Sequence, residues 1–359
     1  MRIGIAAAGS GGHVFPALAV ADALVTKGVA REDIVFFGGD RMEAATVPRA
    51  GYRFVAVNIH GLRRSLSVDN LRLPAKVRSA SKVIGAEIAE SHLQAMVVFG
   101  GYVAGPAALA ARKAHIPLVV HEANAVPGMA NRLVAGRADV VLVAFDAATS
   151  KLPRAVVVGN PLRQSFESFD RLARQERARE RFGVGKERGV LGIFGGSLGA
   201  SALNTLAESI ATAPNRDFDV LHICGPAHFD DVAATAHDIP SWVVLGFEDD
   251  MADVYAACDL VVSRAGAITI SEIEETATPA IVIPLPAGQG YQAQNAAELV
   301  ASGGAVIMDQ SDPESVIRTV FALMDDSERR AEMAQKAGET GHRQAASEVA
   351  DRTLELIHD

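Results

Sequence analysis

The sequence predicts an α/β protein with two Rossmann-like domains, each built around a doubly wound parallel β-sheet. Short apolar runs rich in β-branched residues alternate with longer helical stretches along almost all of the 359 residues. The runs are continuously apolar, which is typical of parallel strands covered by helices on both faces. The alternation restarts near the middle of the chain, and a chain of this length is expected to form two domains.

The elements follow in two series. In the first series, strands are expected at Arg2–Ala8, Ile34–Phe37, Phe54–Val57, Met96–Phe99, Leu118–His121, Val140–Ala144 and Ala155–Val158. Helical patterns between them include Val14–Lys27, Pro106–Ala114 and Met129–Ala135. In the second series, strands are expected at Val190–Phe194, Val220–Cys224, Val243–Leu245, Leu260–Val262, Ala280–Pro284 and Ala305–Met308. A final polar helix is expected at Gly341–Asp359.

The boundary between the domains is expected just after Gly159, Asn160 and Pro161. There a strand ends in a turn-forming triplet, and the charged helix Arg171–Arg181 follows. The predicted domains therefore cover residues 1–162 and 163–341.

Composition and charge exclude several classes of protein. Lys and Arg number 34 against 43 Asp and Glu, for a net charge of −9, whereas general nucleic-acid binding needs a basic surface. Cys224 and Cys258 lie in apolar runs without metal-binding spacing, so we expect buried free thiols in a reducing compartment. No signal peptide and no apolar stretch of about 20 residues is evident, which predicts a soluble protein.

A glycine-rich turn, Gly9–Ala21 (GSGGHVFPALAVA), joins the first strand to the first helix. Its glycines permit a sharp turn, and the N-terminus of the following helix presents free N–H groups to an anion. His13 would project into the crevice at the carboxyl end of the sheet. Alone, such a turn is equally a plain strand–helix connection. A dinucleotide site is disfavoured because Val14 replaces the third glycine of G-x-G-x-x-G.

Two further turns repeat this pattern in the second half. Phe194–Ser201 (FGGSLGAS) contains Ser197, whose hydroxyl can act as a donor and cap the next helix. Ser263–Glu272 places Thr269 and Glu272 on one face of a helix start. A carboxylate there can hold the two hydroxyl groups of a ribose, or Glu272 can simply complement the helix dipole.

Three more segments follow strand ends. Pro284–Ala296 is rich in Gln and Asn, whose amides suit sugar hydroxyls, although an ordinary surface loop has the same composition. Phe99–Ala111 carries Tyr102, and His121–Arg132 carries His121, Glu122 and Asn124. His121 and Glu122 are disfavoured as an acid/base pair because adjacent strand residues face opposite sides. Together the six segments predict a ligand site at the carboxyl ends of the strands.

In combination these segments, with GNPLR at Gly159–Arg163, resemble the bacterial family 28 glycosyltransferases. The members they resemble transfer N-acetylglucosamine (GlcNAc) from UDP-GlcNAc to undecaprenyl-diphosphate-N-acetylmuramyl (MurNAc)-pentapeptide, the last cytoplasmic step of peptidoglycan precursor synthesis. The resemblance covers nearly the whole chain, although Ala8, Ala123 and Tyr291 depart from the family's pattern. It implies the GT-B fold, with an acceptor domain and a donor domain facing a cleft and the helix at 342–359 packing back on the first domain.

The resemblance also implies site residues. The implied catalytic residues are His13, Tyr102 and Glu122, with His13 a candidate general base. The implied donor-binding residues are Ser10, Gly11, Gly12, Asn124, Arg163, Ser197, Asn204, Phe247, Glu272, Gln292 and Asn295. Among these, Glu272 would hold the ribose, Gly246–Met251 would meet the uracil, and Ser197 and Arg163 would contact the diphosphate. Gln292 and Asn295 would bind the GlcNAc, and Asn124 would also face the acceptor.

The implied reaction is an inverting displacement. The acceptor's C4 hydroxyl would attack the anomeric carbon while a base removes its proton, and helix N-termini and Arg163 would stabilise departing UDP. Asp249 and Asp250 lack the spacing of a metal-binding Asp-x-Asp motif, so neither metal nor cofactor is expected. Two alternatives stay open: another UDP-GlcNAc-using GT-B enzyme (a 2-epimerase, or transfer to a soluble acceptor), and a non-catalytic nucleotide-sugar-binding protein.

Residues 63–82 reverse the charge of the acidic chain. They contain one acid, Asp69, among interleaved Leu and Val residues and six cations, Arg63, Arg64, Arg72, Lys76, Arg78 and Lys82. A solvated basic face explains this composition, and so does an interfacial patch for anionic inner-leaflet lipids. The second interpretation predicts a peripheral protein at the cytoplasmic face of the membrane, with UDP-GlcNAc and the lipid-linked acceptor as its other partners.

Overall fold

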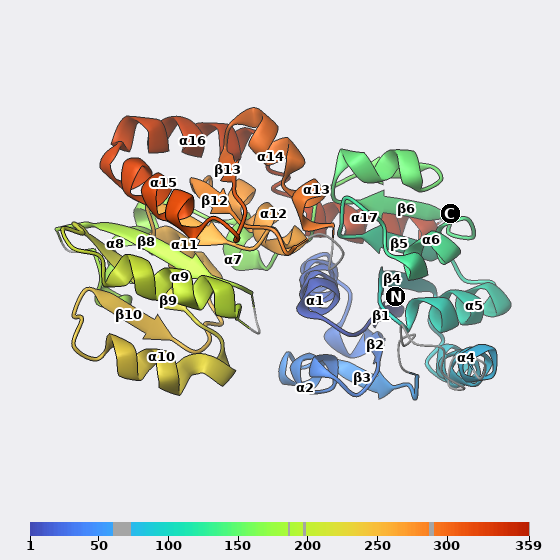
Figure 1. Cartoon of the computed structure of the whole chain (residues 1–359). Helices are drawn as coiled ribbons and strands as arrows, with labels where there is room; N and C mark the ends of the chain where they lie inside the picture. Colours follow the sequence, from blue (N-terminus) through green and yellow to red (C-terminus); the bar gives the residue numbers. More distant parts are fainter. Residues whose placement is uncertain (60–72, 186, 197–198, 287–290, 359) are drawn as a thin grey trace. The chain divides into compact units, whose positions relative to one another are not determined.

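The computed structural model describes residues 1–59, 73–185, 187–196, 199–286 and 291–358, and the chain divides into two compact units. Unit 1 comprises Met1–Arg163 and Gln344–Asp359, and unit 2 comprises Gln164–Arg343. Each unit is built around a parallel sheet with helices packed on it (Figure 1). The predicted doubly wound α/β class is therefore confirmed.

The sheet of unit 1 has seven parallel strands in the order β3-β2-β1-β4-β5-β6-β7. Its strands are β1 (Ile3–Ala7), β2 (Ile34–Gly38), β3 (Arg53–Ala56), β4 (Ala95–Gly100), β5 (Leu118–Glu122), β6 (Val140–Val143) and β7 (Ala155–Val157). Ile5 of β1 lies opposite Phe36 of β2 on one side and Val97 of β4 on the other. The strand order reverses between β1 and β4, which makes this the topological switch point.

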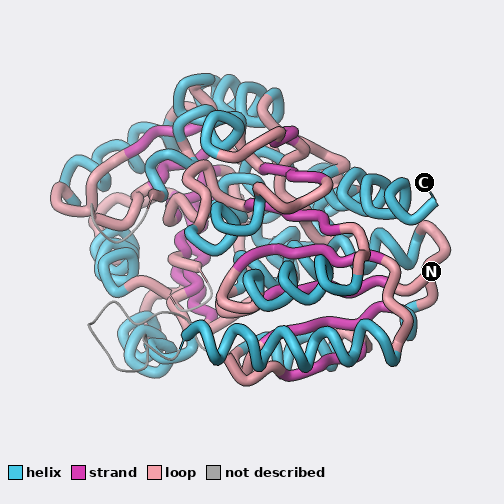
Figure 2. Tube along the Cα trace, turned by 90° about the vertical axis from the view of Figure 1, so that its right-hand side faces the viewer, coloured by secondary structure: helices cyan, strands magenta, loops and turns pink. Residues whose placement is uncertain are grey.

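Helices cover both faces of this sheet (Figure 2). They are α1 (Gly11–Thr26), α2 (Met42–Arg49), α4 (Leu73–Glu90), α5 (Ala104–Ala114), α6 (Met129–Ala135) and α17 (Ala345–His358). Successive β1 side chains point to opposite faces: Ile3 and Ile5 pack with α1 and α17, whereas Ala6 packs with α4 and α5. The C-terminal helix α17 thus belongs to unit 1, and Lys27 forms an ion pair with its Asp351 at 2.8 Å.

Unit 2 repeats the plan with six parallel strands in the order β10-β9-β8-β11-β12-β13. The strands are β8 (Gly189–Phe194), β9 (Phe218–Ile223), β10 (Trp242–Leu245), β11 (Leu260–Ser263), β12 (Ala280–Val282) and β13 (Ala305–Ile307). The helices are α7 (Gln164–Glu167), α8 (Arg171–Phe182), α9 (Ser201–Ala211), α10 (Phe229–Ala236), α11 (Met251–Ala257), α12 (Ala267–Glu275), α13 (Gln292–Asn295), α14 (Ala297–Ser302), α15 (Pro313–Asp325) and α16 (Ser327–Glu339). The switch point lies between β8 and β11.

Local sequence explains where the helices begin and end. Asp170 caps α8 by accepting a hydrogen bond from the Ala173 N–H, and Gly183, whose φ of 68° suits glycine, terminates the helix after Phe182. Asp312 caps α15 in the same way. Cys224 and Cys258 are both buried and free, as expected. Of the helices in the described ranges, none is long and apolar enough to cross a bilayer.

Candidate active site

In unit 1 the predicted residues gather at the carboxyl edge of the sheet. The glycine turn after β1 and the turn after β4 flank the switch point, where doubly wound sheets bind ligands. The two turns are in close contact, because a Cβ on Gly101 would lie 2.1 Å from the carbonyl oxygen of Ala8. Gly101 also has a φ of +75°, so only glycine fits this position.

His13 lies half-buried in the first turn of α1. Its Nδ1 is 3.3 Å from the hydroxyl of Ser10, and a Cβ on Gly100 would come within 3.0 Å of its Nε2. Burial lowers the pKa of His13, although Glu122, the Ala8 carbonyl and Glu43 all act to raise it. The imidazole is therefore neutral at neutral pH and meets the requirement for a general base.

Glu122 is buried at the end of β5 and organises the loop that follows. Its Oε1 accepts hydrogen bonds from the backbone N–H of Asn124 (2.9 Å) and from the side-chain amide of Asn124 (3.1 Å). Its Oε2 accepts from the Gly128 N–H (3.0 Å) and from the Asn131 amide (2.9 Å). Because both carboxylate oxygens already accept hydrogen bonds, Glu122 is better suited to hold this loop in place than to act as a general acid or base.

His121 faces away from this network, as the strand alternation predicts. Its Nε2 lies 2.9 Å from the carbonyl oxygen of Gly159. Burial lowers its pKa to about 4. His121 and Glu122 thus have separate partners, which supports the argument against an acid/base pair.

Tyr102 follows β4, and its hydroxyl donates a hydrogen bond to Glu43 of α2 at 2.7 Å. Glu43 was not predicted as a site residue. It is fully buried and also accepts hydrogen bonds from the backbone N–H groups of Gly39 (3.0 Å) and Gly9 (3.3 Å). Burial and the hydrogen bond to Glu43 raise the pKa of Tyr102, so its hydroxyl stays protonated.

Arg163 ends the first segment of unit 1. Its guanidinium carbon lies 4.6 Å from the centroid of the Phe15 ring of α1. A cation over an aromatic face in this range is attracted to the ring. Arg163 is therefore held next to the helix that begins with Gly11 and Gly12, while Ser10 before it is exposed.

In unit 2 the turn after β8 also packs closely against the backbone of a neighbouring strand end. A Cβ on Gly199 would lie 2.0 Å from the carbonyl oxygen of Cys224, and Gly199 has a φ of +75°. The turn leads into α9, whose N-terminal N–H groups lie at the switch point. Ser197, predicted to contact the diphosphate, lies outside the described residues.

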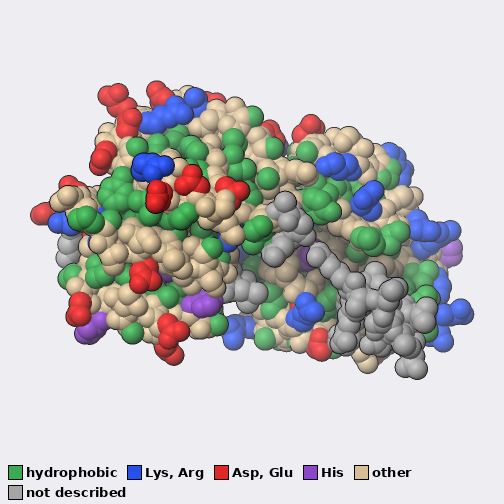
Figure 3. All heavy atoms as spheres, in the orientation of Figure 1, with side chains coloured by type: hydrophobic (Ala, Val, Ile, Leu, Met, Phe, Trp, Pro, Cys, Tyr) green, Lys and Arg blue, Asp and Glu red, His purple; other side chains and the backbone are tan. Residues whose placement is uncertain are grey.

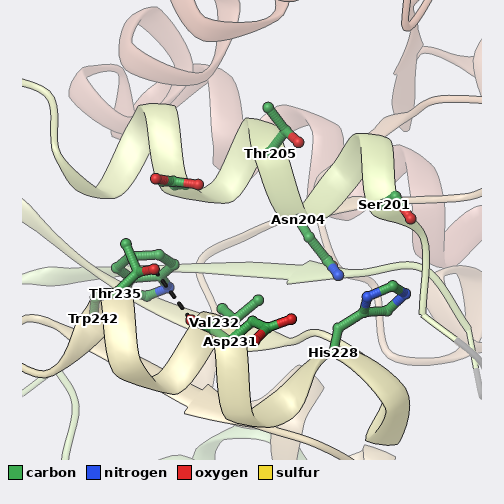
Figure 4. Close-up of a pocket in the computed structure, with 9 residues that line it drawn as sticks. Ser201, Asn204, Thr205, His228, Asp231, Val232, Thr235 and Trp242 are labelled. Carbon is green, nitrogen blue, oxygen red and sulfur yellow. Dashed lines mark hydrogen bonds between the residues drawn. The ribbon is translucent and has the colours of Figure 1, made fainter.

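Asn204 of α9 is buried and has protein partners for both ends of its amide. It donates to the Cys224 carbonyl at 3.1 Å, and its oxygen lies 3.1 Å from Nε2 of His222. It also lines a pocket of about 220 Å³ between α9 and α10, which Figure 4 shows with Trp242 at one end and His228 at the other. This volume is below the roughly 300–1,000 Å³ of ligand pockets.

The segment Gly246–Met251, predicted to meet uracil, connects β10 to α11. Phe247 is 46% exposed, so its ring is accessible. The next residue, Glu248, accepts hydrogen bonds at 2.8 Å on both of its oxygens from Arg181 of α8. Oε1 of Glu248 also accepts from the Asp250 N–H at 2.7 Å. The charged helix α8 therefore holds this segment in place.

Glu272 lies on α12, the helix that follows β11, and is 8% exposed. Its Oε2 accepts a hydrogen bond from the hydroxyl of Tyr255 at 3.0 Å. Tyr255 is fully buried on α11 and was not predicted. The hydrogen bond from Tyr255 orients the carboxylate of Glu272.

Gln292 and Asn295 both contact the backbone of neighbouring turns. Gln292 accepts from the Leu285 N–H at 3.0 Å, and Asn295 donates to the Ala265 carbonyl at 3.3 Å. Arg264, also not predicted as a site residue, donates to the carbonyls of Ile283 (3.0 Å) and Pro284 (3.2 Å) and to Gln310 (2.8 Å). These contacts join the ends of β11 and β12 to the start of α13.

Within each unit the structure brings predicted residues together at one sheet edge. In unit 1 these are Ser10, Gly11, Gly12, His13, Tyr102, Glu122 and Asn124. Among the residues that sequence reasoning missed, Glu43 binds Tyr102 and Tyr255 binds Glu272, whereas Arg264 binds the turn after β12. Arg264 was visible as a charge within an apolar strand–turn segment, whereas Glu43 and Tyr255 occur in ordinary helical patterns without a local signal.

Comparisons with known proteins agree with this architecture. The model of the glycosyltransferase family 28 N-terminal domain matches residues 3–143, and that of the C-terminal domain matches residues 190–349. The N-terminal model thus lies within unit 1, and the C-terminal model covers most of unit 2 and extends into the start of α17.

Similar proteins match the chain along nearly its full length. It is 39% identical over 359 residues to the UDP-N-acetylglucosamine--N-acetylmuramyl-(pentapeptide) pyrophosphoryl-undecaprenol N-acetylglucosamine transferase of Acidothermus cellulolyticus, covering 98% of this chain and 96% of that protein. It is 40% identical over 366 residues to the protein of the same name from Mycobacterium bovis, covering 99% and 88%. The crystal structure of Acinetobacter baumannii MurG superposes with a TM-score of 0.76 at 31% identity, covering 99% and 100%, which confirms the GT-B class. This chain belongs to glycosyltransferase family 28.

Proposed function

We propose that this protein transfers GlcNAc from UDP-GlcNAc to the C4 hydroxyl of MurNAc in a lipid-diphosphate-linked MurNAc-pentapeptide, the last cytoplasmic step of peptidoglycan precursor synthesis. The observation that carries the proposal is the 39–40% identity, along 98–99% of the chain, to relatives named for this transfer. The local geometry supports it, because both switch points combine a glycine turn with a helix N-terminus.

Unit 2 is the proposed donor-binding unit. Glu272, oriented by Tyr255, accepts hydrogen bonds from the ribose hydroxyls, and the segment around Phe247 meets the uracil. The N–H groups at the start of α9 and the side chain of Arg163 are proposed to stabilise the negative charge of departing UDP. Gln292 and Asn295 are the proposed GlcNAc contacts.

His13 is the proposed general base. Its neutral imidazole removes the proton of the C4 hydroxyl as that oxygen attacks the anomeric carbon from the side opposite UDP, so the configuration inverts. Glu122 positions Asn124 and its loop beside the acceptor, and Tyr102 presents its hydroxyl from the neighbouring turn. No step of this scheme uses a metal ion.

The test is turnover with defined substrates. Purified protein is incubated with UDP-GlcNAc and a short-chain lipid-diphosphate-MurNAc-pentapeptide, and products are identified by mass spectrometry. We expect a GlcNAc-MurNAc product and UDP, with EDTA leaving the rate essentially unchanged. Isomerised UDP-sugar without acceptor would indicate a 2-epimerase, and donor binding without product would indicate a binding protein. Activity lost in EDTA and restored by Mg²⁺ would contradict the metal-independent scheme.

A second proposal concerns the membrane. The predicted patch spans residues 63–82, of which 73–82 are described and begin α4. Arg78 and Lys82 are exposed one helical turn apart, and Val83 beside them is 45% exposed. Figure 3 shows several Lys and Arg side chains across the visible face of unit 1. We propose that this face of α4 contacts anionic lipids, each cation contributing about 1 kcal/mol.

Liposome binding tests this contact. Replacing Lys76, Arg78 and Lys82 by Glu should abolish low-salt binding to anionic liposomes and slow transfer to a membrane-embedded acceptor, while transfer to the short-chain acceptor continues. The matched control is Glu at Arg112 and Lys113, two exposed cations in the last turn of α5. If the α4 variant lost both activities equally, or the α5 variant lost liposome binding as fully, the membrane proposal would be wrong.

A further inference from the structure

A carboxylate of α2 connects three turns at the carboxyl edge of unit 1. Glu43 is fully buried, and three of the groups that donate hydrogen bonds to its carboxylate belong to turns that follow three different strands. Gly9 follows β1, Gly39 follows β2 and Tyr102 follows β4. A buried acid with three converging donors is well satisfied, and its removal leaves those donors without their acceptor.

The loop after β2 is shaped to let Tyr102 reach this carboxylate. A Cβ on Gly39 would lie 2.1 Å from the Tyr102 hydroxyl oxygen, so any larger residue would displace the ring. A Cβ on the neighbouring Gly38 would lie 2.7 Å from the Cγ of Glu43 itself. Glycine at both positions therefore makes room for the tyrosine and the glutamate together.

The direction of the Tyr102–Glu43 hydrogen bond has a chemical consequence. Burial acts to raise the pKa of Glu43, but hydrogen bonds from Tyr102, from the backbone N–H of Glu43 itself, and from Gly9 and Gly39 outweigh it, so the pKa lies below its usual value. An ionised carboxylate only accepts hydrogen bonds, so the hydrogen of the Tyr102 hydroxyl points to Glu43. The lone pairs of that oxygen then face other groups as an acceptor.

We propose that Glu43 is a positioning residue for the lipid-linked acceptor substrate. It orients the Tyr102 hydroxyl so that the hydroxyl oxygen can accept a hydrogen bond from an N–H or O–H group of the substrate's sugar or peptide. It also anchors the Gly9 turn that leads to His13. This inference rests on the proposed transferase function and deepens it. Glu43 need not touch substrate, because it acts through Tyr102 and through the Gly9 N–H.

Kinetics of matched variants test the proposal. Glu43→Ala should lower kcat/KM for the lipid acceptor by about 10- to 100-fold, as expected when a binding group is displaced by about 1 Å. The dissociation constant for UDP-GlcNAc, measured by calorimetry, should change less than twofold. Glu43→Gln should reduce kcat/KM less than Glu43→Ala does, because the amide oxygen can still accept the hydrogen bonds that Gly39 and Tyr102 donate to Oε1.

Glu87→Ala controls for the loss of any buried acid. Glu87 is 8% exposed and binds Arg53 and Ser91, away from the site. Its replacement should leave kcat/KM unchanged. In a double-mutant cycle, Glu43→Ala should cost much less in a Tyr102→Phe background than in wild type. Additive effects, or equal losses from Glu43→Ala and Glu87→Ala, would overturn the inference.

A spectroscopic readout keeps the inference independent of the reaction. The chain has four tyrosines, so ¹³Cζ-tyrosine NMR resolves few signals, and Tyr102→Phe assigns one of them. In wild type the Tyr102 signal should begin to titrate well above the ordinary tyrosine pKa of about 10. Glu43→Ala should move that titration to lower pH, and an unmoved midpoint would refute the contact. Absence of transfer by wild type, by contrast, would refute only the proposed function.

Discussion

At the scale of single residues, His13 shows how position determines chemistry. It occupies the first turn of α1, where burial opposes its charged form more strongly than Glu122 and Glu43 favour it. The same side chain on an exposed helix would be partly protonated at neutral pH.

The pH dependence of the reaction follows from this environment. A base must be deprotonated, so kcat/KM for the acceptor should fall on the acid side with a midpoint below about 6.5, the ordinary pKa of histidine. Initial rates between pH 5 and 9 measure this limb. His13→Ala should lower the rate by about 10²–10⁴-fold. A limb centred above 6.5, or one that persists in the variant, would exclude His13 as the base.

Glu272 provides a second prediction at this scale. Glu272→Ala should weaken UDP-GlcNAc binding by about 1–3 kcal/mol, because it leaves ribose hydroxyls without acceptors. Tyr255→Phe should have a smaller effect, since the carboxylate remains but loses its orienting donor. Calorimetry with UDP measures both, with Glu328→Ala on the exposed start of α16 as the control. Unchanged affinity in Glu272→Ala would remove this residue from the donor site.

At the scale of elements, α8 shows how a highly charged helix becomes part of a folded unit. Arg174, Arg177 and Arg181 converge on Asp253 of α11, at 3.1, 3.1 and 3.3 Å. Arg181 also holds Glu248 in the loop before α11. These ion pairs thus connect the proposed uracil-binding segment and α11 to helix α8.

Asp253→Ala should therefore destabilise unit 2. Asp253 is 4% exposed, and losing an ionised acceptor of this kind costs about 1.5–3 kcal/mol. Trp242 is the single tryptophan of the chain and lies in the core of unit 2, so its fluorescence during urea unfolding reports this unit. Asp230→Ala, which removes an exposed acid from α10, is the control. Equal midpoints for both variants would show that the arginine cluster adds little stability.

At the scale of the whole molecule, buried ionisable groups make stability depend on pH. Burial lowers the pKa of His222 to about 4, and burial also raises the pKa of Glu274 to about 8, with Glu298 adding to the effect. Both residues belong to unit 2. They act in opposite directions because one is buried as a neutral base and the other as a neutral acid.

The sign of the pH dependence depends on whether the folded or the unfolded chain binds a proton at the higher pH. The unfolded histidine titrates near 6.5, so His222 contributes its full stabilisation above that pH and loses it as pH falls towards 4, a change on the order of 3 kcal/mol. His222→Gln should flatten the decline of unit 2 stability over this window, as followed by Trp242 fluorescence. His237→Gln, at an exposed position, should leave the decline unchanged. Identical curves for wild type and His222→Gln would contradict the assignment.

The amino-acid sequence by itself determined the fold class and the neighbourhood of the site. Apolar runs and glycine turns are local signals, and parallel strands bring their carboxyl ends to one edge whatever the details of packing. The expected strands therefore correspond to β1–β13, with boundaries differing by at most two residues. Glu122 ends a strand, Tyr102 lies in the turn after one, and His13 and Glu272 lie on helices that follow strands. The family motifs supplied their proposed roles.

Only the tertiary structure decided which side chains hold these residues. Glu43 contacts residues 34 positions before it and 59 positions after it, and Tyr255 contacts Glu272 across 17 positions. Neither contact has a local signature, because the glutamate and the tyrosine occur in ordinary helical patterns. Likewise, the sequence placed Glu122 among candidate catalytic groups, whereas in the fold both of its oxygens accept hydrogen bonds from the following loop and from α6. Hydrogen-bond partners depend on how strands and helices pack, and packing is a property of the assembled chain.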